Sequence, residues 1–338
     1  MNKLLLLIIA TSFFACTTKR QVTEEKVVVA YVTSWSNVIP NPFVMTHINY
    51  AFGHVTDSFD GVRIDNPERL RMLTELKRQN PQLHVLLSVG GWGSGRFSEM
   101  VASKETRLAF CRDCKRVMKK YNLDGIDIDW EYPTSNEAGI SSSPDDKANF
   151  TLLMHDLRKT LGKKALVTLA TISSAQYIDL RAIMPYVSFV NMMTYDMGSA
   201  PMHHAALYPS ERTRWMTASQ GTEAHLKAGV PAEKLVMGVP FYGRGAKMIG
   251  SFLDYKRIQT NEHVREAWDS VAQAPYLENT DGELVLGYDN PRSLKIKCKY
   301  IRQKGLHGVM YWDYAGDNEA GDLQHTLWDE LGTKEVTK

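Results

Sequence analysis

Apolar runs of strand length recur eight times along the chain, and most are separated by segments with the 3.6-residue periodicity of an amphipathic helix. The runs are Val27–Trp35, His47–Gly53, His84–Gly91, Gly125–Glu131, Leu166–Ile172, Phe189–Asp196, Leu235–Gly243 and Gly308–Ala315. The helical segments are Pro67–Asn80, Lys104–Tyr121, Pro144–Leu161, Ala218–Gly229, Pro291–Lys304 and Gly321–Leu331. Alternating strands and helices predict a parallel sheet, and near-continuous apolar strands predict burial on both faces.

Eight such units predict an α/β fold, a single (β/α)8 TIM barrel formed by residues 27–332. A doubly wound dinucleotide-binding fold would need a glycine-rich turn in its first unit, and none is present in the sequence. Between the seventh and eighth strands, Gly250–Gly287 leaves room for at most a reduced insertion.

The N-terminus predicts export. Lys3 precedes an apolar stretch that runs from Leu4 to Ala15 and is too short to span a bilayer as a helix. The ending Phe13-Phe14-Ala15-Cys16 resembles the lipobox of bacterial lipoproteins. We therefore expect a signal peptide over residues 1–16, a lipidated Cys16 and a polar tether over residues 17–26. The protein would be an outer-membrane or cell-surface lipoprotein, or, without lipidation, periplasmic or secreted.

Charge and composition narrow the choice of partner. The chain has 40 basic and 38 acidic residues and a net charge of +2, with no block of Lys or Arg, which argues against nucleic acid as a ligand. Cys111 and Cys114 fall in a helical pattern that predicts buried thiols. The adjacent His203 and His204 have no acid beside them in the sequence. We expect a monomer with no metal and no cofactor, which contacts a membrane only through its lipid anchor.

Polar and aromatic residues gather where the apolar runs end. In a (β/α)8 barrel, functional residues lie at the carboxyl ends of the strands. The residues at six of these ends are Ser34 and Trp35; Trp92; Asp127, Asp129 and Glu131; Tyr195 and Asp196; Tyr242 and Arg244; and Trp312 and Asp313. Six strand ends that agree predict a single site at one face of the barrel.

Three carboxyl groups occupy alternate positions of the fourth run: Asp127, Asp129 and Glu131. Residues two apart on a strand share a face, so the three acids should line the barrel interior while two isoleucines and Trp130 face the helices. Three stacked carboxyls in a partly dry site cannot all ionise cheaply, so at least one should hold a proton near neutrality, as a general acid must. A solvated acidic strand end or a divalent-metal site would not normally interleave its acids with buried Ile and Trp.

The residues around this row form a longer pattern. Asp124-x-x-Asp127-x-Asp129-x-Glu131 is followed by Tyr132-Pro133, and the other segments are Ser88-Val-Gly-Gly91-Trp92, Met193-Thr-Tyr195-Asp196, Pro240-Phe-Tyr242-Gly-Arg244 and Tyr288-Asp-Asn-Pro291 through Trp312. The acidic pattern resembles the signature of the family 18 glycoside hydrolases, the chitinases and their relatives, and the others are similar to further segments of that family in the same order. The resemblance covers the chain from about residue 27 to 328.

The resemblance implies a retaining hydrolase that cleaves β-1,4-linked N-acetylglucosamine, in chitin or chitooligosaccharides, by substrate assistance. Glu131 would protonate the departing glycosidic oxygen while the 2-acetamido oxygen of the sugar attacks the anomeric carbon. Asp129 would accept a hydrogen bond from the acetamido N–H, Asp127 would share a proton with Asp129, and Tyr195 would hold the acetamido group. Glucans without an N-acetyl group would lack the nucleophile and should not react.

Further residues are candidates for sugar binding. They are Trp312, Asp196, Trp92, Tyr242, Arg244, Met193, Tyr31, Phe52 and Trp215. The resemblance implies that Trp312 forms the floor under the distorted sugar and that Asp196 binds sugar hydroxyls or positions its neighbours. Tyr31 and Phe52 lie within strands, where packing in the core is an equal alternative.

Two other functions share parts of this pattern. An endo-β-N-acetylglucosaminidase acting on the chitobiose core of N-glycans has the same acidic motif and mechanism. A chitin-binding lectin of the same family would have lost the acid, but Glu131 and Asp129 are both present. The partner is therefore expected to be chitin, a chitooligosaccharide or another glycan containing N-acetylglucosamine.

Overall fold

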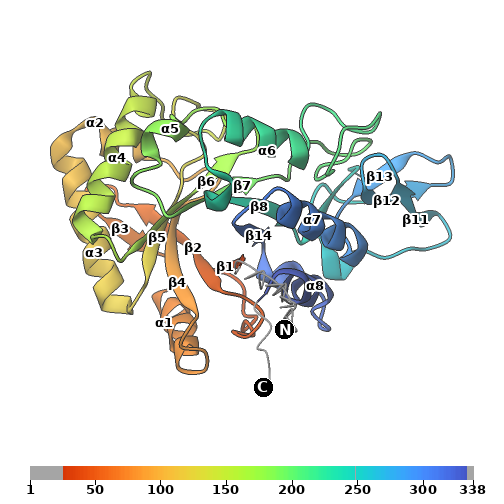
Figure 1. Ribbon diagram of the computed structural model, residues 1–338, viewed down its shortest axis with the longest axis horizontal. Coiled ribbons are helices and arrows are strands. Elements are labelled where there is room, and N and C mark those ends of the chain that lie inside the picture. Colours follow the sequence, from red (N-terminus) through yellow and green to blue (C-terminus); the bar gives the residue numbers. More distant parts are fainter. Residues whose placement is uncertain (1–25, 248, 333–338) are drawn as a thin grey trace, which may run out of the picture.

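The computed structural model describes residues 26–247 and 249–332. In these ranges eight parallel strands close into a barrel with helices around it (Figure 1). The barrel strands are β1 (Val27–Thr33), β2 (His47–Val55), β4 (His84–Gly90), β5 (Gly125–Asp129), β6 (Leu166–Ile172), β7 (Phe189–Met193), β8 (Leu235–Pro240) and β14 (Gly308–Trp312). The barrel closes because β1 pairs in parallel with both β2 and β14. The predicted (β/α)8 fold is confirmed.

The helices follow the predicted segments, with two additions. They are α1 (Pro67–Glu75), α2 (Phe97–Ala102), α3 (Lys104–Tyr121), α4 (Asp146–Leu161), α5 (Leu180–Ile183), α6 (Ala218–Lys227), α7 (Pro291–Gln303) and α8 (Asp322–Leu331), with single 3₁₀ turns η1 (Leu76–Arg78), η2 (Ala232–Lys234), η3 (Tyr255–Arg257) and η4 (Tyr314–Gly316). The sequence did not predict α2 and α5, because six and four residues are too few to establish a helical period. Asn290 and Ser293 form a capping box at the start of α7.

The barrel separates a large outer apolar region from a smaller apolar cluster inside it. On the outer side, Trp130 stacks on Phe97 of α2 with ring centroids 5.2 Å apart and lies 6.1 Å from Phe150 of α4. Inside the barrel a smaller cluster consists of Val29, Tyr31, Ala51, Phe52, Phe189, Val236 and Met310. The predicted division of β5 is confirmed, since its isoleucines pack under the helices and its carboxyl groups do not.

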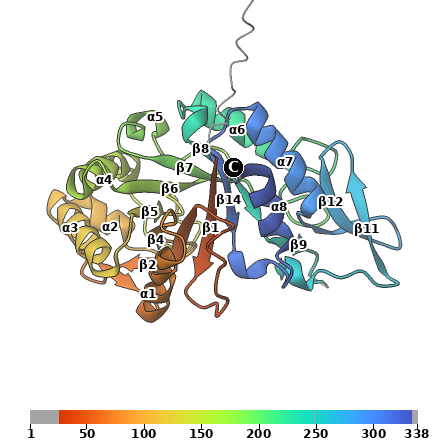
Figure 2. The same ribbon diagram turned by 60° about the horizontal axis from the view of Figure 1, so that its bottom comes forward.

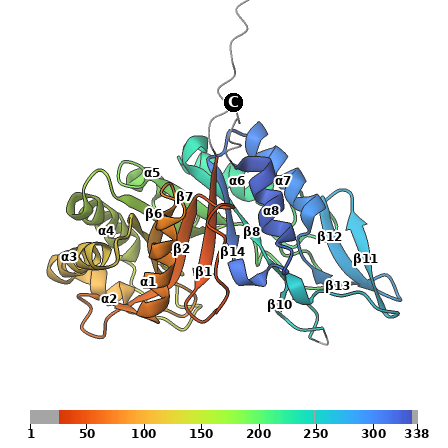
Figure 3. The same ribbon diagram turned by 90° about the horizontal axis from the view of Figure 1, so that it is seen from below.

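A second sheet lies to one side of the barrel, beside α7 and α8 (Figures 2 and 3). It is antiparallel, with the order β10-β9-β13-β12-β11, and its strands are β9 (Tyr242–Gly245), β10 (Leu253–Asp254), β11 (Val264–Asp269), β12 (Ala274–Asn279) and β13 (Leu284–Gly287). This sheet is the reduced insertion that the sequence allowed. The predicted run Leu235–Gly243 is therefore two strands, divided at Phe241, whose ring stacks on Tyr311 of the barrel at 4.2 Å.

One short strand extends the barrel sheet, because β3 (Val62–Ile64) pairs antiparallel with β2. Within residues 26–247 and 249–332, every helix is too short or too polar to cross a membrane. The predicted signal peptide, Cys16 and the tether up to residue 25 lie outside the described residues.

Candidate active site

The polar residues that the sequence placed at strand ends meet at one mouth of the barrel. Several of them lie just beyond the strands, because β5 ends at Asp129 and β7 at Met193. Glu131 is thus two residues past its strand. Asp196 has a left-handed backbone conformation with φ 57°. The predicted strands were therefore too long at their carboxyl ends. The chain stops pairing with neighbouring strands there, and its side chains line the mouth of the barrel.

Two glycines bring the neighbouring strand β4 against the carboxylate strand. The Gly91 N–H donates to the Asp129 carbonyl at 2.8 Å. A Cβ atom on Gly90, whose φ is +132°, would lie 2.0 Å from that same carbonyl oxygen, and one on Gly91 would lie 2.6 Å from the Phe52 ring. Only glycine permits this approach, so Gly90 and Gly91 hold the backbone that carries the acids.

Asp127 is fully buried beneath the cavity and accepts four hydrogen bonds. Thr168 Oγ1 at 2.5 Å and Asn191 Nδ2 at 3.3 Å donate to Oδ1, while Tyr31 Oη at 2.8 Å and Ser88 Oγ at 2.7 Å donate to Oδ2. Burial raises the pKa of Asp127, and these four donors oppose that rise. Both oxygens are occupied, so the side chain is a fixed acceptor under the row.

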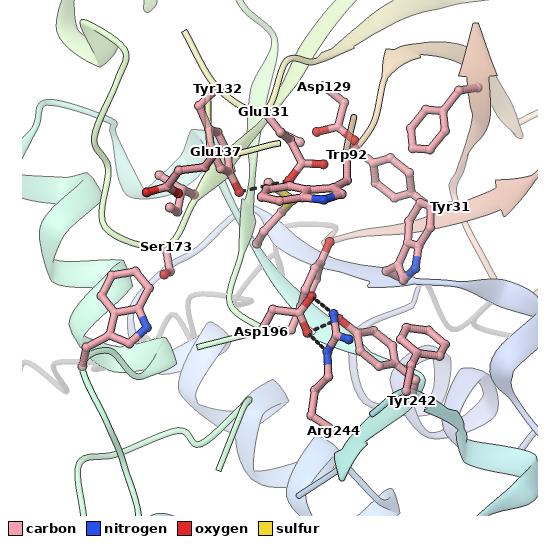
Figure 4. A pocket seen from close by; sticks show the side chains of 18 of the residues that line it. Tyr31, Trp92, Asp129, Glu131, Tyr132, Glu137, Ser173, Asp196, Tyr242 and Arg244 are labelled. Carbon is pink, nitrogen blue, oxygen red and sulfur yellow. Dashed lines mark hydrogen bonds and ion pairs between the residues drawn. The ribbon is translucent and has the colours of Figure 1, made fainter. Parts of the chain in front are cut away.

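Asp129 and Glu131 line the cavity (Figure 4). Burial, the nearby Glu131 and the nearby Asp127 raise the pKa of Asp129 well above its ordinary value. Burial also raises the pKa of Glu131 to about 7, although the Tyr132 hydroxyl donates to Glu131 Oε2 at 3.0 Å and opposes the shift. Among the described residues, the buried Oδ1 of Asp129 has no hydrogen-bond partner. The row therefore contains a carboxyl that is partly protonated at neutral pH, Glu131, and an acceptor that a ligand can use, Asp129 Oδ1.

On the opposite wall, Asp196 is held by residues of β9. The Arg244 guanidinium donates to both carboxylate oxygens, at 2.7 and 2.6 Å, and the Tyr242 hydroxyl donates to Oδ1 at 2.8 Å (Figure 4). Burial raises the pKa of Asp196, but the hydrogen bonds and the positive charge of Arg244 outweigh it, so that pKa is low and the side chain is an anion. Among the residues that the structure describes, the Tyr195 hydroxyl has only the weak acceptor Met310 Sδ, at 3.7 Å, and it is available to a ligand.

Aromatic rings line the cavity on both sides of the acids. At one end Trp312 stacks on Phe52 at 5.6 Å and lies 5.8 Å from Tyr31 and 6.3 Å from Trp35. At the other end Trp92 and Trp215 are 63% and 47% exposed, which is unusual for the largest apolar side chain. Exposed indole faces beside a polar cavity suit the apolar faces of sugar rings.

The cavity has a volume of about 570 Å³. It is lined by Asp129, Glu131, Tyr195, Trp312, Asp196, Trp92, Tyr242, Arg244, Met193, Tyr31, Phe52 and Trp215, which are all of the predicted site residues of the barrel except the buried Asp127. Hollows of about 550 and 720 Å³ adjoin it, the first sharing Trp35 and Trp312 and the second sharing Asp196 and Trp215. The site is therefore open at both ends, as a groove for a chain would be.

Six other lining residues were not predicted as part of the site: Tyr132, Glu137, Ala170, Ile172, Ser173 and Phe252. Phe252 stacks on Tyr242 at 4.2 Å and comes from the insertion, where no sequence pattern marks it. Glu137 and Ser173 come from loops that follow β5 and β6. Tyr132 could have been predicted as a site residue, because it directly follows Glu131 in the acidic motif.

His203 and His204 lie apart from any ligand set. His203 Nε2 is 3.2 Å from Asp269 Oδ2, and His204 Nδ1 is 3.6 Å from Asp196 Oδ1. No acid partner was evident from the sequence, because Asp269 is 66 residues away from His203 on β11 and Asp196 is eight residues before His204. In the described part of the chain, no three His, Cys, Asp or Glu side chains converge as metal ligands.

Comparisons with known proteins agree with this geometry. Residues 27–317 match the family described as glycosyl hydrolases family 18. Chitinase A1 of Niallia circulans is 32% identical, over 98% of this chain and 62% of that protein, and an endochitinase of Manduca sexta is 31% identical, over 82% and 59%. The chain thus spans about three fifths of the length of these two relatives. The structure of a family 18 N-acetylglucosaminidase from Paenibacillus barengoltzii matches with a TM-score of 0.83 and 34% identity, over 90% of this chain and 100% of that one.

Proposed function

Because the chain belongs to the glycosyl hydrolases of family 18, we propose that it hydrolyses β-1,4-linked N-acetylglucosamine, in chitin or chitooligosaccharides, with retention of configuration. One observation carries the proposal: a buried carboxyl with a pKa of about 7, Glu131, stands beside a buried carboxylate oxygen of Asp129 that lacks a partner among the described residues. An acetamido N–H is the donor that this oxygen requires, and the glycosidic oxygen is the base that Glu131 can protonate.

The reaction proceeds in two steps. Glu131 gives its proton to the glycosidic oxygen as the bond from that oxygen to the anomeric carbon breaks. The 2-acetamido oxygen of the same sugar forms the new bond to that carbon, giving an oxazolinium-like intermediate. Water, deprotonated by Glu131, then opens the ring from the side that the leaving group occupied, so the configuration is retained.

The other residues stabilise the transition state. Asp129 accepts the acetamido N–H and offsets the positive charge that develops on the ring. The free Tyr195 hydroxyl donates to the acetamido oxygen, and Trp312 supports the sugar from below. Asp127 is an acceptor fixed under Asp129, and it can share a proton with Asp129 only if one of its four donors yields.

The test is product analysis with chitohexaose. The purified protein should release chitobiose or chitotriose whose new reducing ends are initially the β anomer, detected by mass spectrometry and NMR. Glu131→Gln should lower kcat about 10²–10⁴-fold, the usual contribution of a general acid. Glu223→Gln, the same change at a surface glutamate of α6 paired with Lys304, should retain full activity.

Substrate analogues separate the mechanism from its alternatives. Cellohexaose and fully deacetylated chitosan hexamer should not react, because neither carries the acetamido nucleophile. Release of free glycans from a high-mannose glycoprotein, with chitohexaose left intact, would assign the chain to N-glycan hydrolysis. Full activity of Glu131→Gln would show that another group is the acid.

We also propose that the barrel, residues 27–332, is exported as a monomer and attached to the membrane by a lipidated Cys16 behind a tether over residues 17–26. Support for this comes from the lipobox-like sequence alone. Metabolic labelling with a palmitate analogue should mark the wild type, and Cys16→Ala should abolish the label. Label retained by Cys16→Ala would refute the anchor, and the elution volume of the soluble form tests the monomer.

A further inference from the structure

The Asp196 backbone lies in the left-handed region, with φ 57°. Asp adopts this region more often than most residues with a Cβ atom, but it still costs conformational energy that contacts must offset. Arg244 and Tyr242 hold the carboxylate from the cavity side. They do not touch the backbone of Asp196, so its backbone must be supported from elsewhere.

That support comes from the loop that follows β7 and returns behind the site. His204 on this loop is fully buried. The Asp196 backbone N–H donates to His204 Nδ1 at 3.4 Å, and Nδ1 lies 3.6 Å from Asp196 Oδ1. The His204 ring also packs on the Tyr242 ring at 5.3 Å. One imidazole therefore contacts the backbone of Asp196 and the ring that holds its carboxylate.

The loop leaves His204 little room to move. The Met197 N–H donates to the His204 carbonyl at 3.0 Å, and a Cβ atom on Gly198 would lie 2.5 Å from the His203 carbonyl oxygen. The charged or titratable groups near the ring are Asp196, Tyr242 and, beyond the Asp196 carboxylate, Arg244. His203 points away, toward Asp269.

The hydrogen bond from Asp196 requires an unprotonated Nδ1, which puts the proton of the neutral ring on Nε2. Nε2 is buried and has no hydrogen-bond partner among the described residues. A buried polar group without a partner costs stability, and in a native structure it calls for an explanation, which a role in positioning Asp196 can supply.

We propose that His204 is a positioning residue for catalysis, which fixes the backbone of Asp196 and thereby the place of its charge opposite Glu131. This inference rests on the proposed hydrolase activity. The Asp196 charge is one of the causes that keep the pKa of Glu131 raised, after burial. Moving that charge should therefore alter the acid without any direct contact to it.

The test compares three variants on chitohexaose. His204→Leu removes Nδ1 and should lower kcat about 10- to 100-fold with KM within about threefold, as expected when a catalytic group is misplaced. The high-pH limb of kcat/KM should also move to lower pH. His204→Asn puts its side-chain oxygen near the position of Nδ1 and should restore most of kcat and the wild-type limb. His203→Asn, an adjacent buried change that faces Asp269, should leave both unchanged.

The outcomes separate this inference from the proposed function. If the wild type is inactive on every N-acetylated substrate, the proposed function fails first. If the wild type is active and folded His204→Leu keeps its kcat and pH profile, the positioning role is wrong. The role is equally wrong if His204→Asn and His204→Leu lose the same factor while both melt cooperatively, because the acceptor would then not matter.

Discussion

At the scale of single residues, the site sets a different proton affinity for each carboxyl by a different physical means. Asp127 is surrounded by donors, Asp196 is paired with a guanidinium, and Glu131 is buried with a single phenolic donor. Burial raises a carboxyl pKa, while donors and cations lower it. Of these three residues, Glu131 has the fewest donors and a pKa of about 7, and this arrangement can be tested by titration.

The pH profile is the first prediction at this scale. A general acid must be protonated, so kcat/KM should fall about tenfold per pH unit as pH rises above the pKa of Glu131, about 7. Tyr132→Phe removes the donor that lowers this pKa and should move the high-pH limb to higher pH. Initial rates on chitotetraose between pH 5 and 10 give the profiles of the wild type and of Tyr132→Phe. A high-pH limb that is unchanged in Tyr132→Phe would show that Tyr132 does not lower the pKa of Glu131.

At the scale of elements, helix α7 fixes the loop that carries His204. Lys297 is buried within α7 and donates to Asp289 Oδ2 at 2.5 Å and to the carbonyl of Ala205 at 2.7 Å. Ser293 Oγ donates to Asp289 Oδ1 at 2.7 Å. The Lys297 ammonium group thus connects α7 with Asp289, which follows the last strand of the insertion, and with the loop that carries His204.

Removal of one partner of this ion pair should be costly. Lys297→Met leaves Asp289 as an uncompensated buried charge, so the free energy of unfolding should fall by about 3–5 kcal/mol. The double variant Lys297→Met/Asp289→Asn removes both charges and should recover much of that loss. Urea denaturation measures both values. Equal losses in the two variants would mean that Ala205 and not the ion pair accounts for the effect.

At the scale of the whole molecule, the neutral histidines of the interior make the fold sensitive to acid. His47 lies at the start of β2 with His84 at 4.9 Å and Phe189 at 5.4 Å. Burial, followed by the nearness of His84 and His307, lowers the pKa of His47 to about 3. A histidine with a lowered pKa binds its proton in the unfolded chain first, so it destabilises the fold as pH falls below about 6.5.

The expected slope follows from this linkage. The contribution of His47 to the free energy of unfolding is complete above pH 6.5. It is lost progressively toward pH 3, at roughly 1.4 kcal/mol per pH unit. Replacement by Gln removes the titration, so the free energy of unfolding of His47→Gln should depend less steeply on pH between 6 and 4. Chemical denaturation at several pH values gives the slopes. If the free energy of unfolding depended equally steeply on pH in the wild type and in His47→Gln, His47 would not be a buried neutral residue.

The sequence predicts the barrel and its acids because both follow local periods. Strands buried on both faces are apolar throughout, and the acids two residues apart on β5 share a face. The insertion is different, since the exposed positions of β11 carry no clear alternation and its partners are set by long-range pairing. Asp269, the acid partner of His203, lies on β11 and depends on that pairing, and Phe252 depends on the pairing of β10 with β9, so no window of sequence could place them.

The closure of the barrel also governs how the chain can fold. Val27 of the first strand pairs with Gly308 of the last, so the ring of strands remains open until nearly the entire polypeptide has been synthesised. Contacts between such distant residues slow folding, because a large loop must close before they form. Until β14 arrives, β1 and β8 each expose an unpaired edge, and unpaired edges promote association between chains. A chain shortened before β14 would therefore face aggregation rather than a loss of catalysis alone.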